Sequence, residues 1–241
     1  MEKDKYHQKM ARPNYKNWMP KGMILGFAGA FALCLVLTLV IRLGWLRIVF
    51  LIASIALACV TLWTLLMHRA FSYEGKRQMS RQIIEGVAAY IDLIGGGRIL
   101  DVGCGSGALA IAVAKRNQKA FVTGIDRWGA EYASFSKSLC EENARSEGVG
   151  DRTEFKQGDA LKLDFPDGSF DAVVSNYVYH NIPSKDRQAI LLETLRVLKK
   201  GGAFAIHDTY EKDHINSTSC TVFRSVFRPG WRPPQVPGNS Y

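Results

Sequence analysis

Cysteine is scarce and scattered in this chain of 241 residues. The five cysteines are Cys34, Cys59, Cys104, Cys140 and Cys220. They show neither the spacing of a zinc site nor the regular framework of a disulfide-rich domain. Both of these classes are therefore excluded, no metal site is expected, and we expect all five to be small buried side chains in a reducing compartment.

The main part of the chain also lacks a surplus of basic charge. The net charge is +9, yet residues 68–210 hold nineteen basic against eighteen acidic residues. Residues 1–21 carry six Lys or Arg against two acidic residues, and Arg42 and Arg47 add two more positive charges. A nucleic-acid-binding domain would carry its excess on the folded surface. Nucleic acid is therefore not an expected partner, and the basic residues beside apolar stretches indicate membrane orientation.

Two stretches contain no charged residue at all. Residues 22–41 and 48–67 are each twenty residues long, which matches the ~20 residues that a helix needs to cross a bilayer. Since residues 42–47 form only a short connector, we predict a transmembrane helical hairpin. More Lys and Arg flank its outer ends than its connector, so the positive-inside rule predicts a multi-pass protein of the cell membrane with its N-terminus and main domain in the cytoplasm.

Other interpretations of the apolar stretches fit less well. A cleaved signal peptide would end in a small-x-small site, whereas here a second apolar stretch follows within a few residues. A buried hairpin of a soluble protein would be amphipathic, whereas both stretches are apolar on every face. A substrate channel would be supported by an ionisable residue inside the stretches, and neither contains one. A membrane anchor is the preferred interpretation.

After a linker at 68–80, segments with strand and helix patterns alternate. The predicted helices cover 81–94, 108–116, 130–147 and 185–198, and the predicted strands cover 98–102, 121–125, 153–156, 170–175 and 203–207. Such alternation predicts an α/β domain, here residues 81–210, with a parallel sheet covered on both faces. Ligands bind such sheets outside the carboxyl ends of the strands.

The turn after the first predicted strand, residues 103–107, has glycine at every second position. Glycine lets a backbone bend sharply and approach a ligand closely, and this spacing also fits a loosened dinucleotide fingerprint. Asp126 ends the second strand, where a carboxylate accepts hydrogen bonds from ribose hydroxyls with either kind of cofactor. Asp101, inside the first strand, distinguishes between the two kinds of cofactor, because an acidic neighbour favours a cationic sulfonium over a pyrophosphate.

The run Ile-Leu-Asp-Val-Gly-Cys-Gly-Ser-Gly at 99–107 resembles motif I of class I S-adenosylmethionine-dependent methyltransferases. Four further segments resemble later motifs of that family in the same order. They are Asp126, Gly-Asp-Ala at 158–160, the runs 165–171 and 175–181, which are similar to quinone-biosynthesis methyltransferases, and 195–202. The resemblance covers about residues 80–210, and five motifs in order are far more specific than one. It implies a Rossmann-like, doubly wound, mostly parallel sheet.

The resemblance implies S-adenosylmethionine as the cofactor. The cofactor-binding residues that it implies are Asp101, Gly103, Cys104, Gly105, Ser106, Gly107, Asp126, Arg127, Asp159, Ala160 and Asn176. The glycines would line the methionine part, Asp126 would hold the ribose, and Asp159 with Ala160 would border the adenine. The alternatives are that the glycines only make a tight turn, that Asp126 caps a helix and that Asp159 is an ordinary loop carboxylate.

Catalytic candidates follow the fourth predicted strand. Methyl transfer depends on alignment, and it needs a base only where the acceptor must lose a proton. His180, Asn176 and Tyr177 are the candidates, with His180 as the base; packing roles for the histidine and the tyrosine are the alternative. The Asn-Pro-Pro-aromatic motif of many amino-group methyltransferases is absent, which disfavours nucleic acids and proteins as substrates.

The leading hypothesis is methyl transfer to a small-molecule or lipid-like acceptor at the membrane. The alternatives are a membrane-tethered binding protein without turnover and a NAD-dependent oxidoreductase. The tail, residues 211–241, holds four of the eight prolines, and proline removes donors from a strand ladder. With 218–227 as its one candidate strand, we hypothesise that the tail is a truncated or altered ending of the sheet.

Overall fold

The computed structural model describes residues 12–129, 134–182 and 187–208. The chain divides into two compact units, one made of residues 16–82 and the other of the residues from Ile83 onward together with the segment that ends at Tyr15. The tail and its candidate strand at 218–227 lie outside the described residues, so the hypothesis of an altered ending stays a prediction.

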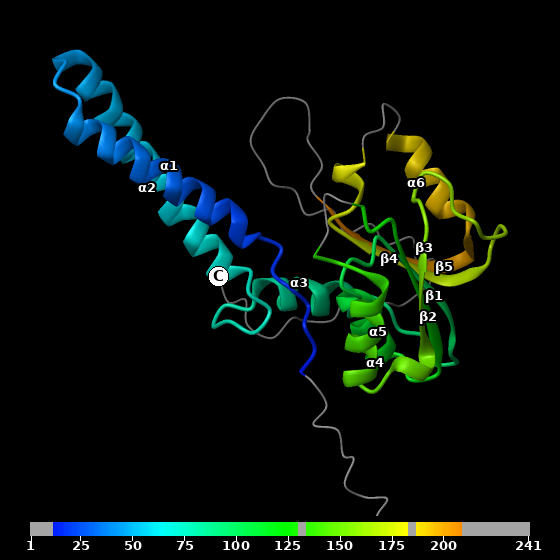
Figure 1. Cartoon of the computed structure of the whole chain (residues 1–241). Coiled ribbons are helices and arrows are strands. Elements are labelled where there is room, and N and C mark those ends of the chain that lie inside the picture. The colour runs from blue at the N-terminus through cyan, green and yellow to red at the C-terminus, as the bar shows by residue number, and fades with distance from the viewer. Residues whose placement is uncertain (1–11, 130–133, 183–186, 209–241) are drawn as a thin grey trace, which may run out of the picture. The chain divides into compact units, whose positions relative to one another are not determined.

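The smaller unit contains the predicted apolar hairpin. Its helices α1 (Lys21–Val40) and α2 (Gly44–Ala70) pack along each other, as Figure 1 shows. Both are long and apolar enough to cross a membrane. The buried hydroxyls of Thr38, Ser54 and Thr64 each donate a hydrogen bond of 2.8–3.0 Å to a carbonyl one turn earlier. These polar groups are therefore satisfied within their own helices, as an apolar environment requires.

The second apolar helix is longer at both ends than the charge-free stretch 48–67. It begins at Gly44, because the amide of Arg47 already bonds the Leu43 carbonyl at 3.0 Å, and a charged residue does not prevent a helical turn. At its other end, His68 Nδ1 lies 2.8 Å from the Met19 carbonyl, and the Asn17 amide donates to the His68 carbonyl at 2.8 Å. The predicted six-residue connector is thus only residues 41–43.

The larger unit is built on a parallel sheet. Among the described residues, five strands lie in the order β3-β2-β1-β4-β5, and every neighbouring pair is parallel. The strands are β1 (Gly97–Val102), β2 (Ala120–Asp126), β3 (Thr153–Gln157), β4 (Phe170–Asn176) and β5 (Leu198–His207). The predicted mostly parallel sheet is confirmed.

Helices cover this sheet on both faces. The covering helices are α4 (Ala108–Arg116), α5 (Lys137–Ser146) and α6 (Arg187–Arg196). Helix α3 (Met79–Ala88) precedes β1, and the short 3₁₀ turns are η2 (Gly150–Arg152) and η3 (Tyr179–Asn181). Figure 1 shows α4 and α5 on one side of the sheet and α6 on the other. The central strand β1 is therefore enclosed, and its Ile99, Leu100 and Val102 are completely buried.

Three element boundaries differ from the predicted ones because tertiary contacts decide them. Helix α3 stops at Ala88 rather than at 94, and the side chain of Asn117 accepts from the Leu93 amide at 2.7 Å and donates to the Ile91 carbonyl at 3.2 Å. Helix α5 begins after Ser136, whose hydroxyl caps it; of the predicted helix from 130, residues 130–133 lie outside the described part. Strand β5 extends back to residue 198, where a register shift lets it pair with β4.

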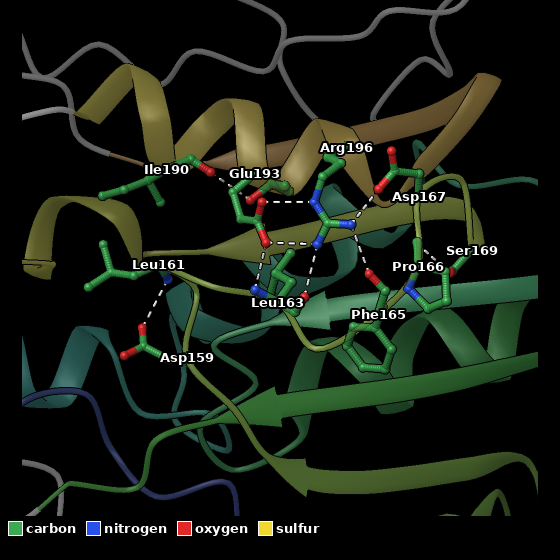
Figure 2. Close-up of polar contacts among 11 residues, drawn as sticks. Asp159, Leu161, Leu163, Phe165, Pro166, Asp167, Ser169, Ile190, Glu193 and Arg196 are labelled. Atoms are coloured by element: carbon green, nitrogen blue, oxygen red, sulfur yellow. Dashed lines mark hydrogen bonds and ion pairs between the residues drawn. The ribbon is translucent and has the colours of Figure 1, made fainter.

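The loop between β3 and β4 is tied to the end of α6 by one guanidinium group (Figure 2). Arg196 donates to the carbonyls of Leu163 and Phe165, both at 2.9 Å, and to the carboxylates of Asp167 at 2.6 Å and Glu193 at 2.8 Å. The hydrogen bond from Arg196 is the main reason why the pKa of Glu193 falls to about 2. The charged contact therefore persists at all but strongly acidic pH and fixes this loop.

Candidate cofactor and acceptor site

The glycine turn at the carboxyl end of β1 has a backbone that other residues would strain. Gly103, Gly105 and Gly107 have φ angles of 75°, 55° and 79°. A Cβ atom on Gly103 would lie 2.2 Å from a methyl carbon of Val178. Glycine at 103 is therefore required both by the left-handed conformation and by the close approach of the segment that follows β4.

Gly105 is held on both sides of its peptide unit. Its amide donates to Asp126 at 2.8 Å, and its carbonyl accepts from the indole of Trp128 and from the thiol of Cys140, both at 3.1 Å. The second carboxylate oxygen of Asp126 accepts the Trp128 amide at 2.8 Å. Asp126 thus braces the glycine turn from the end of β2, and a carboxylate has further lone pairs with which to accept from a ligand hydroxyl.

A cavity of about 590 Å³ opens at the carboxyl ends of β2 and β3. Its lining residues are Arg127, Trp128, Gly129, Gln157, Gly158 and Asp159. Arg127 and Asp159, both implied by the resemblance, come within 4.0 Å of each other there, and Asp159 also accepts the Leu161 amide at 2.9 Å. Ala160 is not part of this lining, because its side chain is buried in the core.

Asp101 is the most unusual group of the site. It is 1 % exposed, and its Oδ2 atom has no hydrogen-bond partner among the described residues. Burial raises its pKa to about 8, a backbone hydrogen bond from Ala110 opposes this shift, and the charge of Asp126 adds to it. A buried acid with one unpartnered oxygen fits a site that receives a cationic group, such as an ammonium or a sulfonium.

Two members of the glycine turn offer only their backbones to a ligand. The side chains of Cys104 and Ser106 are buried, and burial, followed by the contact with Cys140, raises the pKa of the Cys104 thiol well above its ordinary value. Both remain in the site as spacers between the glycines, and neither presents a reactive group.

Asn143 of α5 joins the glycine turn to the segment that precedes α1. Its amide group donates to the Ser106 carbonyl at 2.9 Å and to the Asn14 carbonyl at 3.1 Å, and its oxygen accepts the Asn14 amide at 2.7 Å. Tyr15 beside it is 5 % exposed and donates to Glu147 at 3.1 Å. Sequence reasoning missed Asn143, since a polar residue on a helix carries no signal of such a role.

A second cluster of polar groups stands at the ends of β4 and β5. His180, in η3, lies with its Nδ1 atom 2.5 Å from Asp208. The other oxygen of Asp208 accepts the backbone amides of Tyr179 at 2.6 Å and His180 at 3.4 Å. Asp208 is 1 % exposed. Sequence reasoning missed it as a site residue, although its place directly after the last predicted strand was a usable signal.

The other two catalytic candidates belong to the same cluster. Asn176 lies 3.0 Å from Nδ1 of His207 through its side-chain oxygen. Tyr177 adopts a φ of 55°, and its ring makes edge-on contacts with the rings of His180 and His207 at 5.8 Å and 4.7 Å. Burial lowers the pKa of His207. A non-glycine residue in the left-handed region at a strand end is often part of a functional site.

The two clusters adjoin, because the strands that carry them pair side by side. Val102 of β1 pairs with Ser175 of β4, and Asn176 pairs with His207 of β5. The packing of Val178 on Gly103 then brings the segment with His180 against the glycine turn. The structure therefore gathers the glycine turn, Asp126 and the His180 cluster at one edge of the sheet.

Comparisons with known proteins agree with this geometry. Residues 99–202 match the family model described as "Methyltransferase domain". The 27-O-demethylrifamycin SV methyltransferase of Amycolatopsis mediterranei is 34% identical over 134 residues, which are 54% of this chain and 45% of that protein. The 2-phytyl-1,4-naphtoquinone methyltransferase of Synechococcus elongatus is 36% identical over 137 residues, 56% of this chain and 54% of that protein. Both alignments cover less than two thirds of the relative.

A solved structure of geranyl diphosphate methyltransferase in complex with S-adenosylmethionine is similar with a TM-score of 0.46 and 21% identity, and the match covers 55% of this chain and 50% of that one. The family match at 99–202 coincides with the sheet and its glycine turn. Residues 99–202 therefore form a methyltransferase domain.

We predict that Gly103→Ala destabilises the chain far more than Gly148→Ala. Both glycines have φ above 70°, so both variants carry the strain of a left-handed alanine. Only at 103 does the new Cβ meet another side chain, whereas nothing lies within 4 Å at 148. We expect an additional loss of roughly 1–3 kcal/mol at 103, measured by chemical denaturation of the full chain in detergent. Equal losses would contradict the contact between the turn and Val178.

We also predict that Asp101→Asn changes how stability depends on pH. The pKa of Asp101 is about 8 in the folded chain against an ordinary value of 3.8, so this carboxyl destabilises the fold progressively as pH rises from about 4 to 8. Asparagine does not titrate. The melting temperature of the variant, relative to wild type, should therefore rise between pH 4 and pH 8. The exposed Asp164→Asn is the control, and a pH-independent difference for Asp101→Asn would refute the assignment.

Proposed function

We propose that this chain transfers a methyl group from S-adenosylmethionine to a small-molecule or lipid-like acceptor at a membrane. The observation that carries the proposal is Asp101, a buried carboxyl with an unpartnered oxygen directly before the glycine turn. When bound, S-adenosylmethionine supplies an electrophilic methyl group on a positively charged sulfur. A bound cation would stabilise the ionised form of this acid, whereas the pyrophosphate of a dinucleotide would disfavour that form further.

The residues present fit the three parts of this cofactor. The backbone of the turn 103–107 would line the methionine part beside Asp101. Asp126 would accept from the ribose hydroxyls with the lone pairs that Gly105 and Trp128 leave free. The cavity between Arg127 and Asp159 would take the adenine.

The acceptor would be bound next to the second cluster. We assign Asn176, Tyr177 and His180 to acceptor contact, because they follow β4 and adjoin the glycine turn through Val178. The relative from Synechococcus elongatus is named for a phytyl-substituted naphthoquinone, a lipophilic acceptor. That name supports, for this chain, an acceptor that dissolves in a membrane.

The apolar hairpin supports the membrane part of the proposal. Within this unit, Leu25 and Leu39 each expose 71% of their surfaces, and Ile52 and Trp63 each expose 63%. The core helix of a soluble protein would bury such side chains, and contiguous apolar surface of this extent calls for a membrane or a partner. With the basic residues outside the hairpin, the positive-inside rule supports a cytoplasmic N-terminus and a cytoplasmic domain.

Calorimetric titration of the full chain in detergent tests the cofactor. We expect binding of S-adenosylmethionine and S-adenosylhomocysteine and no binding of NAD. Asp126→Asn should weaken binding by about 10- to 100-fold, since a hydrogen bond to a charged acceptor contributes roughly 1.5–3 kcal/mol. Asp164→Asn, on an exposed loop position, should leave affinity unchanged. Binding of NAD in preference to both sulfur compounds would contradict the proposal.

Alkaline extraction and protease accessibility test the membrane location. We expect the full chain to stay in the membrane pellet at high pH, and a protease on the cytoplasmic side to remove both an N-terminal tag and the domain. Release of the chain by alkali would contradict insertion. Protection of the tag with digestion of the domain would contradict a hairpin that returns to the same side.

A further inference from the structure

The pairing of His180 with Asp208 has a chemical consequence beyond cofactor binding. Because Nδ1 of His180 lies 2.5 Å from the Asp208 carboxylate, Nδ1 carries the proton of the neutral ring, and Nε2 is left with a lone pair. In the part of the chain that the structure describes, Nε2 has no hydrogen-bond partner, and the side chain of His180 is 29% exposed. The ring therefore presents a proton acceptor that a ligand can reach.

Asp208 is itself fixed in one orientation. Its Oδ2 atom accepts hydrogen bonds from the backbone amides of Tyr179 and His180. These two donors require a hydrogen-bond acceptor at the place of Oδ2. Its Oδ1 atom is then the one that faces the imidazole. The edge-on contact with Tyr177, at 86° between the ring planes, adds a second restraint on the His180 ring. An oriented imidazole backed by a buried carboxylate is the arrangement of a general base.

We infer that His180 is the general base for an acceptor that carries an ionisable hydroxyl, of the phenolic or enolic kind, and that Asp208 is its positioning residue. This inference rests on the proposed function. An alkene acceptor needs no base before methyl transfer, and a carboxylate is already ionised at neutral pH. A phenolic hydroxyl, with a pKa of about 10, must lose its proton during attack, and a neutral imidazole is suited to take it.

The methyl transfer needs only the acceptor hydroxyl, the methyl donor, His180 and Asp208. The acceptor oxygen forms a bond to the methyl carbon while the bond from that carbon to sulfur breaks and leaves its electron pair on sulfur. The hydroxyl proton moves to Nε2 of His180. The Asp208 carboxylate stabilises the resulting imidazolium and does not itself become protonated. The products are a methyl ether and a neutral thioether, and the proton leaves His180 to solvent afterwards.

Substitution of Asp208 by asparagine gives a sharp structural expectation. The amides of Tyr179 and His180 would hold the asparagine oxygen at the place of Oδ2, so the NH₂ group would face Nδ1 of His180. Nδ1 would become the acceptor and the proton would move to Nε2. Asp208→Asn should thus reverse the tautomer of His180 and remove the base without removing the ring.

The first experiment compares variants of the full chain in detergent, with a membrane lipid extract as the source of acceptor and methyl-labelled S-adenosylmethionine. His180→Asn keeps an N–H donor toward Asp208, and it should lower label transfer by about 100- to 10,000-fold, as should Asp208→Asn. Both should bind S-adenosylhomocysteine within about twofold of wild type by calorimetry. Asp164→Asn, at an exposed position outside the site, should leave label transfer unchanged.

A second readout does not depend on turnover. Nitrogen-15 NMR of histidine-labelled chain should show the proton of His180 on Nδ1 in the wild type and on Nε2 in Asp208→Asn, with the His180→Asn spectrum assigning the signal. An unchanged tautomer in Asp208→Asn would overturn the positioning role.

The chemical class of the product decides the acceptor. Hot hydriodic acid should release the label of a wild-type reaction as methyl iodide, as it does from a methyl ether, and mild alkali should not release it. Label that resists hydriodic acid marks a carbon acceptor, and label released by mild alkali marks a carboxylate; either would overturn the assignment while the proposed methyl transfer stands. No incorporation by a chain that binds the cofactor would overturn both.

Discussion

The peptide unit of Gly105 is the point on which the site depends. Its amide is bound by Asp126, and its carbonyl is bound by Trp128 and Cys140, so groups from β2, the segment after it and α5 all converge on a residue without a side chain. A flexible glycine turn would lose considerable entropy on binding a ligand. Here the fold has already fixed the turn, and the backbone that would contact a cofactor is held in place before the cofactor arrives.

The sheet divides the chemistry between its two halves. The ends of β1, β2 and β3 carry three features that suit different groups of a ligand. Asp101 suits a cation, Asp126 suits a diol, and the cavity beside Asp159 suits a ring. The ends of β4 and β5 carry His180 and Asp208, which suit an acceptor that loses a proton. Parallel pairing between β1 and β4 sets the two halves next to each other. Under the proposed function, position in the sheet would therefore separate cofactor binding from acceptor activation within one site.

Sequence patterns predicted the parts of this arrangement that follow from local rules. Alternating strands and helices predicted the parallel sheet, and glycine spacing predicted the turn, because backbone conformation and burial leave direct marks on residue choice. Partners such as Trp128 and Asn143 left no such mark, since their roles depend on distant groups, and Asp208 was marked only by its place directly after the last predicted strand. The same reason explains the end of α3. The side chain of Asn117 binds the Leu93 amide just beyond this helix, and the two residues are 24 positions apart in the sequence.

Hydrogen exchange of the full chain in detergent, with and without S-adenosylhomocysteine, tests the central claim most directly, because it reports on the backbone that is proposed to hold the cofactor. The account predicts slower exchange in peptides that contain the turn 103–107 and the segment 126–129, and no such effect with NAD. Slower exchange confined to other peptides, or protection of the turn by NAD alone, would contradict it.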